Sequence, residues 1–72
     1  MAKQIFELKV GQPYIQLNKL LQVMHIAQTG GHAKILIQNE EVLVNGTTEF
    51  RIRKKLVKND QIEVGESLIK II

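Results

Sequence analysis

Residues 29–46, TGGHAKILIQNEEVLVNG, decide the fold of this chain. Thr29 is a good helix N-cap, and from Ala33 onward the apolar residues recur with the spacing of one helix face. The stretch closes on Asn45-Gly46, two residues that tolerate the positive φ angles of a tight hairpin turn. These signals predict a helix that leads into a β-hairpin.

The residues before this stretch predict one strand and a second helix. Apolar and polar residues alternate over residues 5–10, and the glycine and proline of residues 11–13 end the predicted strand. Apolar side chains then repeat with helical spacing at Leu17, Leu20, Leu21 and Met24. We expect this short helix to pack against the one that starts at Thr29.

The residues after the hairpin turn predict a return strand and two further strands. The return strand is expected to place Thr48, Phe50 and Ile52 on one face and Glu49, Arg51 and Arg53 on the other. Residues 58–60 predict a turn in which Asn59 adopts a left-handed conformation, followed by strands at 62–64 and 68–72. With no repeat or linker, residues 1–72 are predicted to form a single α+β domain.

The composition restricts the class of protein. The chain has no cysteine, so it can form neither a disulfide nor a thiolate metal site, which suits a reducing cytoplasm. The N-terminal residues lack the apolar segment of a secretion signal, and no segment is apolar enough to span a membrane. We therefore expect a soluble, cytoplasmic protein. We also expect it to be a monomer.

Basic residues are concentrated in one segment. The formal net charge is +3, and half of the ten basic residues fall within residues 51–58, a run that contains no acid. They are Arg51, Arg53, Lys54, Lys55 and Lys58. The run favours a phosphate-binding patch, while a merely solvated face is the alternative.

Gly30-Gly31 has two compatible interpretations. In the structural interpretation, the glycines let a crowded turn form between the two helices. In the functional interpretation, residues without side chains let a phosphate approach the exposed N–H groups at the positive end of the helix dipole.

Four segments resemble the S-four RNA-binding domain, also called the alpha-L motif. They are LNKLL at 17–21, TGGHAKILI at 29–37, VLVNG at 42–46, and KL at 55–56 together with NDQI at 59–62. The match covers about residues 15–64, and its TGG-x-AK form is similar to the stand-alone bacterial subgroup called YaaA-like. The resemblance implies an α+β fold of two short helices packed on a small antiparallel sheet. It also implies that the chain binds structured RNA, of ribosomal or transfer type, through the phosphate backbone.

The sequence departs from the family pattern at two basic positions. Gln16 and Gly30 stand where many members carry arginine, so no arginine contact is carried over to them, whereas Lys34 matches a basic position of the second helix. The expected RNA-binding residues come from both helices and the basic run. They are Lys19, Thr29, Gly30, Gly31, His32, Lys34, Arg51, Arg53, Lys54 and Lys55.

Catalysis and metal binding find little support in the residues. No nucleophile, histidine and acid stand at a recognisable spacing, and the chain is small for a substrate cleft. His25 and His32 have no acidic or thiol companion, so we expect no metal, no cofactor and no small-molecule substrate.

Two further expectations concern the partner. The only aromatic residues are Phe6, Tyr14 and Phe50, and Phe50 is expected to face the core. Without a stacking platform, the chain is expected to read folded RNA through its backbone and shape. The alternative function is a protein-interaction module, in which a strand edge or the helix pair docks on a ribosome-associated or assembly protein and the charge serves solubility.

Overall fold

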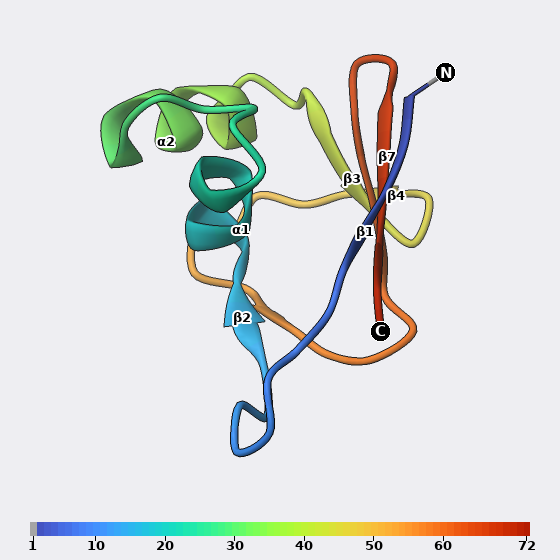
Figure 1. The fold of residues 1–72 in the computed structure, drawn as a ribbon. Coiled ribbons are helices and arrows are strands. Elements are labelled where there is room, and N and C mark those ends of the chain that lie inside the picture. The colour runs from blue at the N-terminus through green and yellow to red at the C-terminus, as the bar shows by residue number, and fades with distance from the viewer. Residues whose placement is uncertain (1) are drawn as a thin grey trace.

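The computed structural model describes residues 2–72, so Met1, the first residue of the predicted domain, lies outside the described residues. Two helices stack beside a five-stranded sheet, and a separate pair of very short strands lies below the first helix (Figure 1). The elements in chain order are β1 Ala2–Phe6, β2 Ile15–Gln16, α1 Leu17–Val23, α2 Gly30–Gln38, β3 Val42–Val44, β4 Thr47–Thr48, β5 Lys55–Leu56, β6 Gln61–Val64 and β7 Ser67–Ile71.

The five-stranded sheet has the order β1-β7-β6-β3-β4. The pairs β7–β6, β6–β3 and β3–β4 are antiparallel, as the family resemblance implies. β1 differs, because it runs parallel to β7, with Ala2 opposite Ser67 and Phe6 opposite Ile71. The predicted α+β fold class is therefore confirmed, and the sheet is mixed rather than purely antiparallel.

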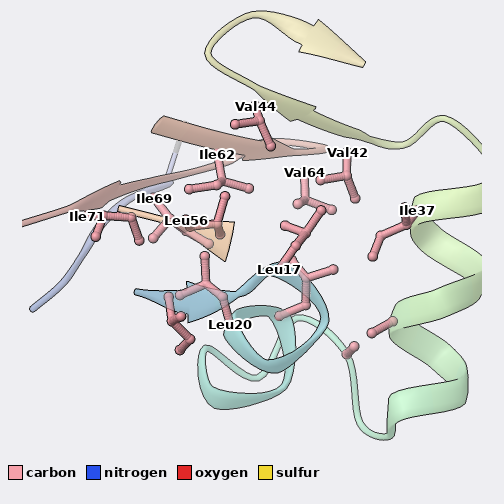
Figure 2. Close-up of a cluster of buried hydrophobic side chains, with 14 residues drawn as sticks. Leu17, Leu20, Ile37, Val42, Val44, Leu56, Ile62, Val64, Ile69 and Ile71 are labelled. Atoms are coloured by element: carbon pink, nitrogen blue, oxygen red, sulfur yellow. The ribbon is translucent and has the colours of Figure 1, made fainter. Parts of the chain in front are cut away.

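The core lies between the helix pair and one face of the sheet (Figure 2). Leu17, Leu20 and Leu21 of α1 are fully buried, which confirms the predicted apolar stripe. From α2, Ala33 and Ile37 are buried as well. The sheet and the short strand β5 contribute buried residues, which are Val42, Val44, Leu56, Ile62, Val64, Ile69 and Ile71.

The predicted strand at residues 5–10 is wrong in position. β1 occupies Ala2–Phe6, and the chain then leaves the sheet toward a turn at residues 10–11. Its last bond to the sheet is donated by the Leu8 N–H to the Ile72 carbonyl, at 2.9 Å. The alternation continues past Phe6 because Leu8 packs on the core, whereas Val10 is fully exposed.

The predicted return strand is also wrong beyond Thr48. The Glu49 N–H still donates to the Val42 carbonyl at 3.0 Å, but the chain then crosses to the helices (Figure 1). There the N–H groups of Leu17 and Asn18 donate to the carbonyls of Lys54 and Ile52, at 2.8 and 3.0 Å.

The physical reason lies at the start of α1. Its N-cap residue, Gln16, makes no side-chain capping bond. The first N–H groups of a helix have no partner inside the helix, so they need acceptors from elsewhere. The segment after β4, residues 49–54, supplies these acceptors and so cannot continue as a strand. We call it the 49–54 loop.

Two asparagines fix the turns of the sheet, as predicted. Asn45 and Asn59 have φ angles of 52° and 77°. The Asn45 side-chain oxygen accepts from the Gln61 N–H at 2.9 Å, and its amide group donates to the Asp60 carboxylate at 3.1 Å. The same carboxylate accepts from the Val57 N–H at 2.8 Å. Asn45 and Asp60 therefore hold the β3–β4 turn against the turn before β6.

Within residues 2–72, neither helix is long and apolar enough to cross a membrane.

Candidate nucleic-acid interface

The first turn of α2 presents uncovered backbone N–H groups. Thr29 is the N-cap, as predicted, and its hydroxyl oxygen accepts from the His32 N–H at 3.0 Å. Gly30 and Gly31 are both exposed, and helical geometry leaves their N–H groups without an acceptor inside the helix. The positive end of the helix dipole lies at the same place.

The two glycines are not needed for packing. A Cβ atom at Gly30 would meet the Gln22 side chain at 3.6 Å, and one at Gly31 would meet the Thr29 hydroxyl at 3.8 Å, both ordinary contacts. Positive φ angles occur at Gly11, Gly46 and Gly65 but not at these two glycines. The interpretation that a crowded turn requires them is therefore not supported. Their effect is to leave the start of α2 open to a ligand.

His32 and Lys34 extend this helix end. The Nδ1 atom of His32 accepts from the Gln28 N–H at 3.2 Å, so the imidazole stabilises the segment that enters the helix. The side chain of Lys34 is exposed one turn into α2. Histidine, cysteine and acidic residues form no cluster of three or more that could hold a metal ion within residues 2–72.

The 49–54 loop contains an ion pair that the sequence interpretation missed. The Glu49 carboxylate accepts from Arg51 Nε at 3.0 Å, from Arg51 Nη2 at 3.1 Å and from the Arg51 backbone N–H at 3.0 Å. The expectation that the basic run has no compensating acid is therefore wrong, because Glu49 lies just before the run. A signal was present in the alternation, which placed both residues on one strand face.

The pair changes the protonation of both partners. The hydrogen bonds from the Arg51 side chain hold the pKa of the Glu49 carboxyl below its ordinary value, despite partial burial that acts in the opposite direction. The pKa of the Arg51 guanidinium is raised, mainly by the same hydrogen bonds. Both groups are therefore charged at neutral pH, and Glu49 offsets much of the Arg51 charge.

The remaining basic residues of the region keep their charge available. Glu49–Arg51 is the only ion pair among residues 2–72, so Lys34, Arg53, Lys54 and Lys55 pair with no acid there. The ammonium group of Lys55 lies 5.0 Å from the centre of the Tyr14 ring, a cation–π contact that positions it without cancelling its charge.

Arg53 joins the helix end to the basic loop. One hollow of the surface is lined by Arg51, Arg53, Lys54 and Lys55. A neighbouring hollow is lined by Asn18, Gly30, Gly31, Lys34, Ile52 and Arg53. Because Arg53 lines both, the hollow at the start of α2 and the hollow of the loop adjoin at this residue. We call the residues of these two hollows the basic surface.

The basic surface and the expected RNA-binding residues overlap but do not coincide. Thr29 and His32 line neither hollow, and Ile52 lines one of them although it was not expected. Lys19 lines a different hollow, together with Lys9, Val10 and Val23, so it is not part of the basic surface. Asn18 was not among the expected residues, but it lines the hollow at the start of α2, and its side-chain oxygen has no hydrogen-bond partner among residues 2–72. The sequence offered one indication for Asn18, because it lies in LNKLL, one of the four segments that resemble the family.

Comparisons with known proteins identify the family of the chain. The family model described as the S4 domain matches residues 8–72. The solution structure of YbcJ from E. coli, which has an alfaL motif involved in RNA-binding, is 28% identical and superimposes with a TM-score of 0.71 over 94% of this chain and 85% of that chain. No curated protein sequence matches the chain. The predicted family is confirmed: the chain belongs to the S4 domain family.

Proposed function

We propose that this chain is a non-catalytic RNA-binding protein whose basic surface holds the phosphate backbone of structured RNA, of ribosomal or transfer type. Membership of the S4 domain family and the likeness to YbcJ, whose motif is involved in RNA-binding, support the class of ligand. The observation that carries the proposal is the position of Arg53, which lines both the hollow at the start of α2 and the hollow of the loop cations.

The chemistry of this surface matches phosphate. Backbone N–H groups at a helix start donate to anionic oxygens, and the helix dipole favours negative charge there. Lys34 and Arg53 line the hollow around these N–H groups, and Lys54 and Lys55 extend the positive charge along the loop. Such contacts bind the backbone with little dependence on base sequence.

Salt dependence tests the electrostatic mechanism. A fluorescently labelled RNA hairpin is titrated with the protein at a series of KCl concentrations, and the anisotropy gives the dissociation constant. If about four phosphates are contacted, log affinity should fall against log salt with a slope of roughly −3. A flat dependence would exclude phosphate contacts as the source of affinity.

A pair of charge-matched variants tests the location. The variant K34Q/R53Q/K55Q removes three cations of the basic surface, and K3Q/K9Q/K70Q removes three cations outside it. Both lower the formal charge from +3 to zero. The first variant is expected to reduce the slope to about −1, while the second keeps a slope close to that of the wild type. Equal effects would show that net charge, not this surface, drives binding.

A further inference from the structure

Phe50 is an exposed aromatic residue immediately before the basic run. It was expected to face the core, but 56% of its surface is accessible. It lies in the 49–54 loop, directly before Arg51 and three residues after the start of β4. An exposed aromatic ring therefore directly precedes the basic run in the chain, where the sequence interpretation placed no stacking platform.

The backbone on both sides of Phe50 is fixed. The Glu49 N–H donates to the Val42 carbonyl of β3, and the Arg51 N–H donates to the Glu49 carboxylate, each at 3.0 Å. Farther along the loop, the Ile52 carbonyl accepts from the Asn18 N–H of α1. The loop thus holds Phe50 outward before any ligand binds, which lowers the entropic cost of a contact with the ring.

The surroundings of the ring match a nucleotide. Arg51 and Arg53 follow Phe50 along the loop, and the acid next to it, Glu49, is already occupied by Arg51. An exposed ring that is followed in the loop by two arginines fits a ligand that carries a flat π-face beside a phosphate. A protein partner would need a wider apolar area, but the neighbours of Phe50 in the chain, Glu49 and Arg51, are charged.

We propose that Phe50 stacks on an unpaired base of the RNA that the basic surface holds. The inference rests on the proposed function and narrows its ligand: the RNA carries an unpaired nucleotide, in a bulge or loop, next to a paired segment. A base inside an intact helix is stacked on its neighbours and cannot meet a protein ring, whereas an unstacked base is open to aromatic side chains. Every base has a flat π-face, so the stacking contact with Phe50 tolerates changes in the RNA sequence.

Two RNA hairpins test the inference with the full chain. They share one stem, closed by a stable tetraloop whose bases are stacked on one another. One hairpin carries a single bulged adenosine in the stem, and the other lacks it, so only the first offers an unstacked base. The wild-type protein is expected to bind the bulged hairpin about 5- to 100-fold more tightly, the range that one stacked base supplies. F50L is expected to bind both hairpins with nearly equal affinity, because leucine keeps the apolar character but not the ring.

A second variant supplies a direct readout. The chain has no tryptophan, so F50W introduces a single indole. Its fluorescence is expected to be quenched on binding the bulged hairpin and to change little with the paired one. Far-UV circular dichroism of F50L and F50W should match the wild type, since the ring is exposed.

The outcomes separate the two proposals. If the wild type binds both hairpins with equal affinity, or if F50L keeps the preference for the bulge, the role of Phe50 is refuted. The proposal that the basic surface binds phosphates is unaffected by that result. If the wild type binds neither hairpin, the proposed function itself fails. Loss of the preference in F50L, with quenching in F50W, supports the stacking contact.

Discussion

Replacing Arg53 by glutamine removes the one charge that both hollows share. Arg53 is exposed and pairs with no acid among residues 2–72, so no ion pair within the protein offsets its attraction to a phosphate. At 4 Å, two unit charges attract by about 1 kcal/mol in water and by about 4 kcal/mol near a protein surface. For an exposed side chain the lower part of this range applies, about 1–2 kcal/mol, which corresponds to a loss of affinity of about 5- to 30-fold.

The assay is the anisotropy titration of a labelled hairpin at several KCl concentrations. Besides weakening binding, R53Q should make the salt slope shallower by about 0.7 to 0.9, because one phosphate contact is lost. Lys3, an exposed residue of β1, provides the matched control, and K3Q should change the affinity less than about twofold. Equal losses of affinity in R53Q and K3Q, or an unchanged salt slope in R53Q, would show that Arg53 makes no phosphate contact of its own.

Three further expectations concern the turn, the helix cap and the ion pair that support the basic surface. N45A removes both hydrogen bonds of the Asn45 amide and places alanine at a φ of 52°, so urea unfolding should show a loss of about 1–3 kcal/mol. Its control, N39A, alters a helix C-cap side chain at an ordinary φ of −85° and should cost less than about 0.5 kcal/mol. T29A removes the cap of α2 and should cost about 1 kcal/mol in the same assay, whereas T29S should restore most of it. Carbon NMR of the Glu49 carboxyl should give a pKa below 4.5, and this pKa should return toward 4.5 in R51Q. Because the folded state lowers this pKa, the stability from the pair is present above about pH 4.5 and is lost as the pH falls through the lowered value. An unchanged Glu49 titration in R51Q, or equal costs for N45A and N39A, would count against these assignments.

Local signals in the sequence predicted the parts of the fold that depend on nearby residues. The leucine spacing of α1, the Thr29 cap and the left-handed turns at Asn45 and Asn59 each follow from the chemistry of one or a few adjacent residues, and all are found. The family resemblance then supplied how these pieces are arranged, which local patterns do not contain.

The missed features depend on partners far away in the sequence. The parallel pairing of β1 with β7 brings together residues more than sixty positions apart, and β2 and β5 are too short to leave a pattern. The 49–54 loop leaves the sheet because α1 lacks a capping side chain and takes the carbonyls of Ile52 and Lys54 as acceptors. That requirement decides the exposure of Phe50 and the place of Arg53, so the proposed binding face could only be identified once the fold was known.

Amide NMR mapping tests the central claim most directly. Labelled protein is titrated with the bulged hairpin, and the shift of each backbone amide is followed. We expect the largest shifts at Gly30, Gly31, Lys34 and across residues 50–55, with small shifts in β1 and β7. Shifts concentrated on β1 and β7, or spread evenly over the molecule, would contradict the claim that one basic surface, joined by Arg53, binds the RNA.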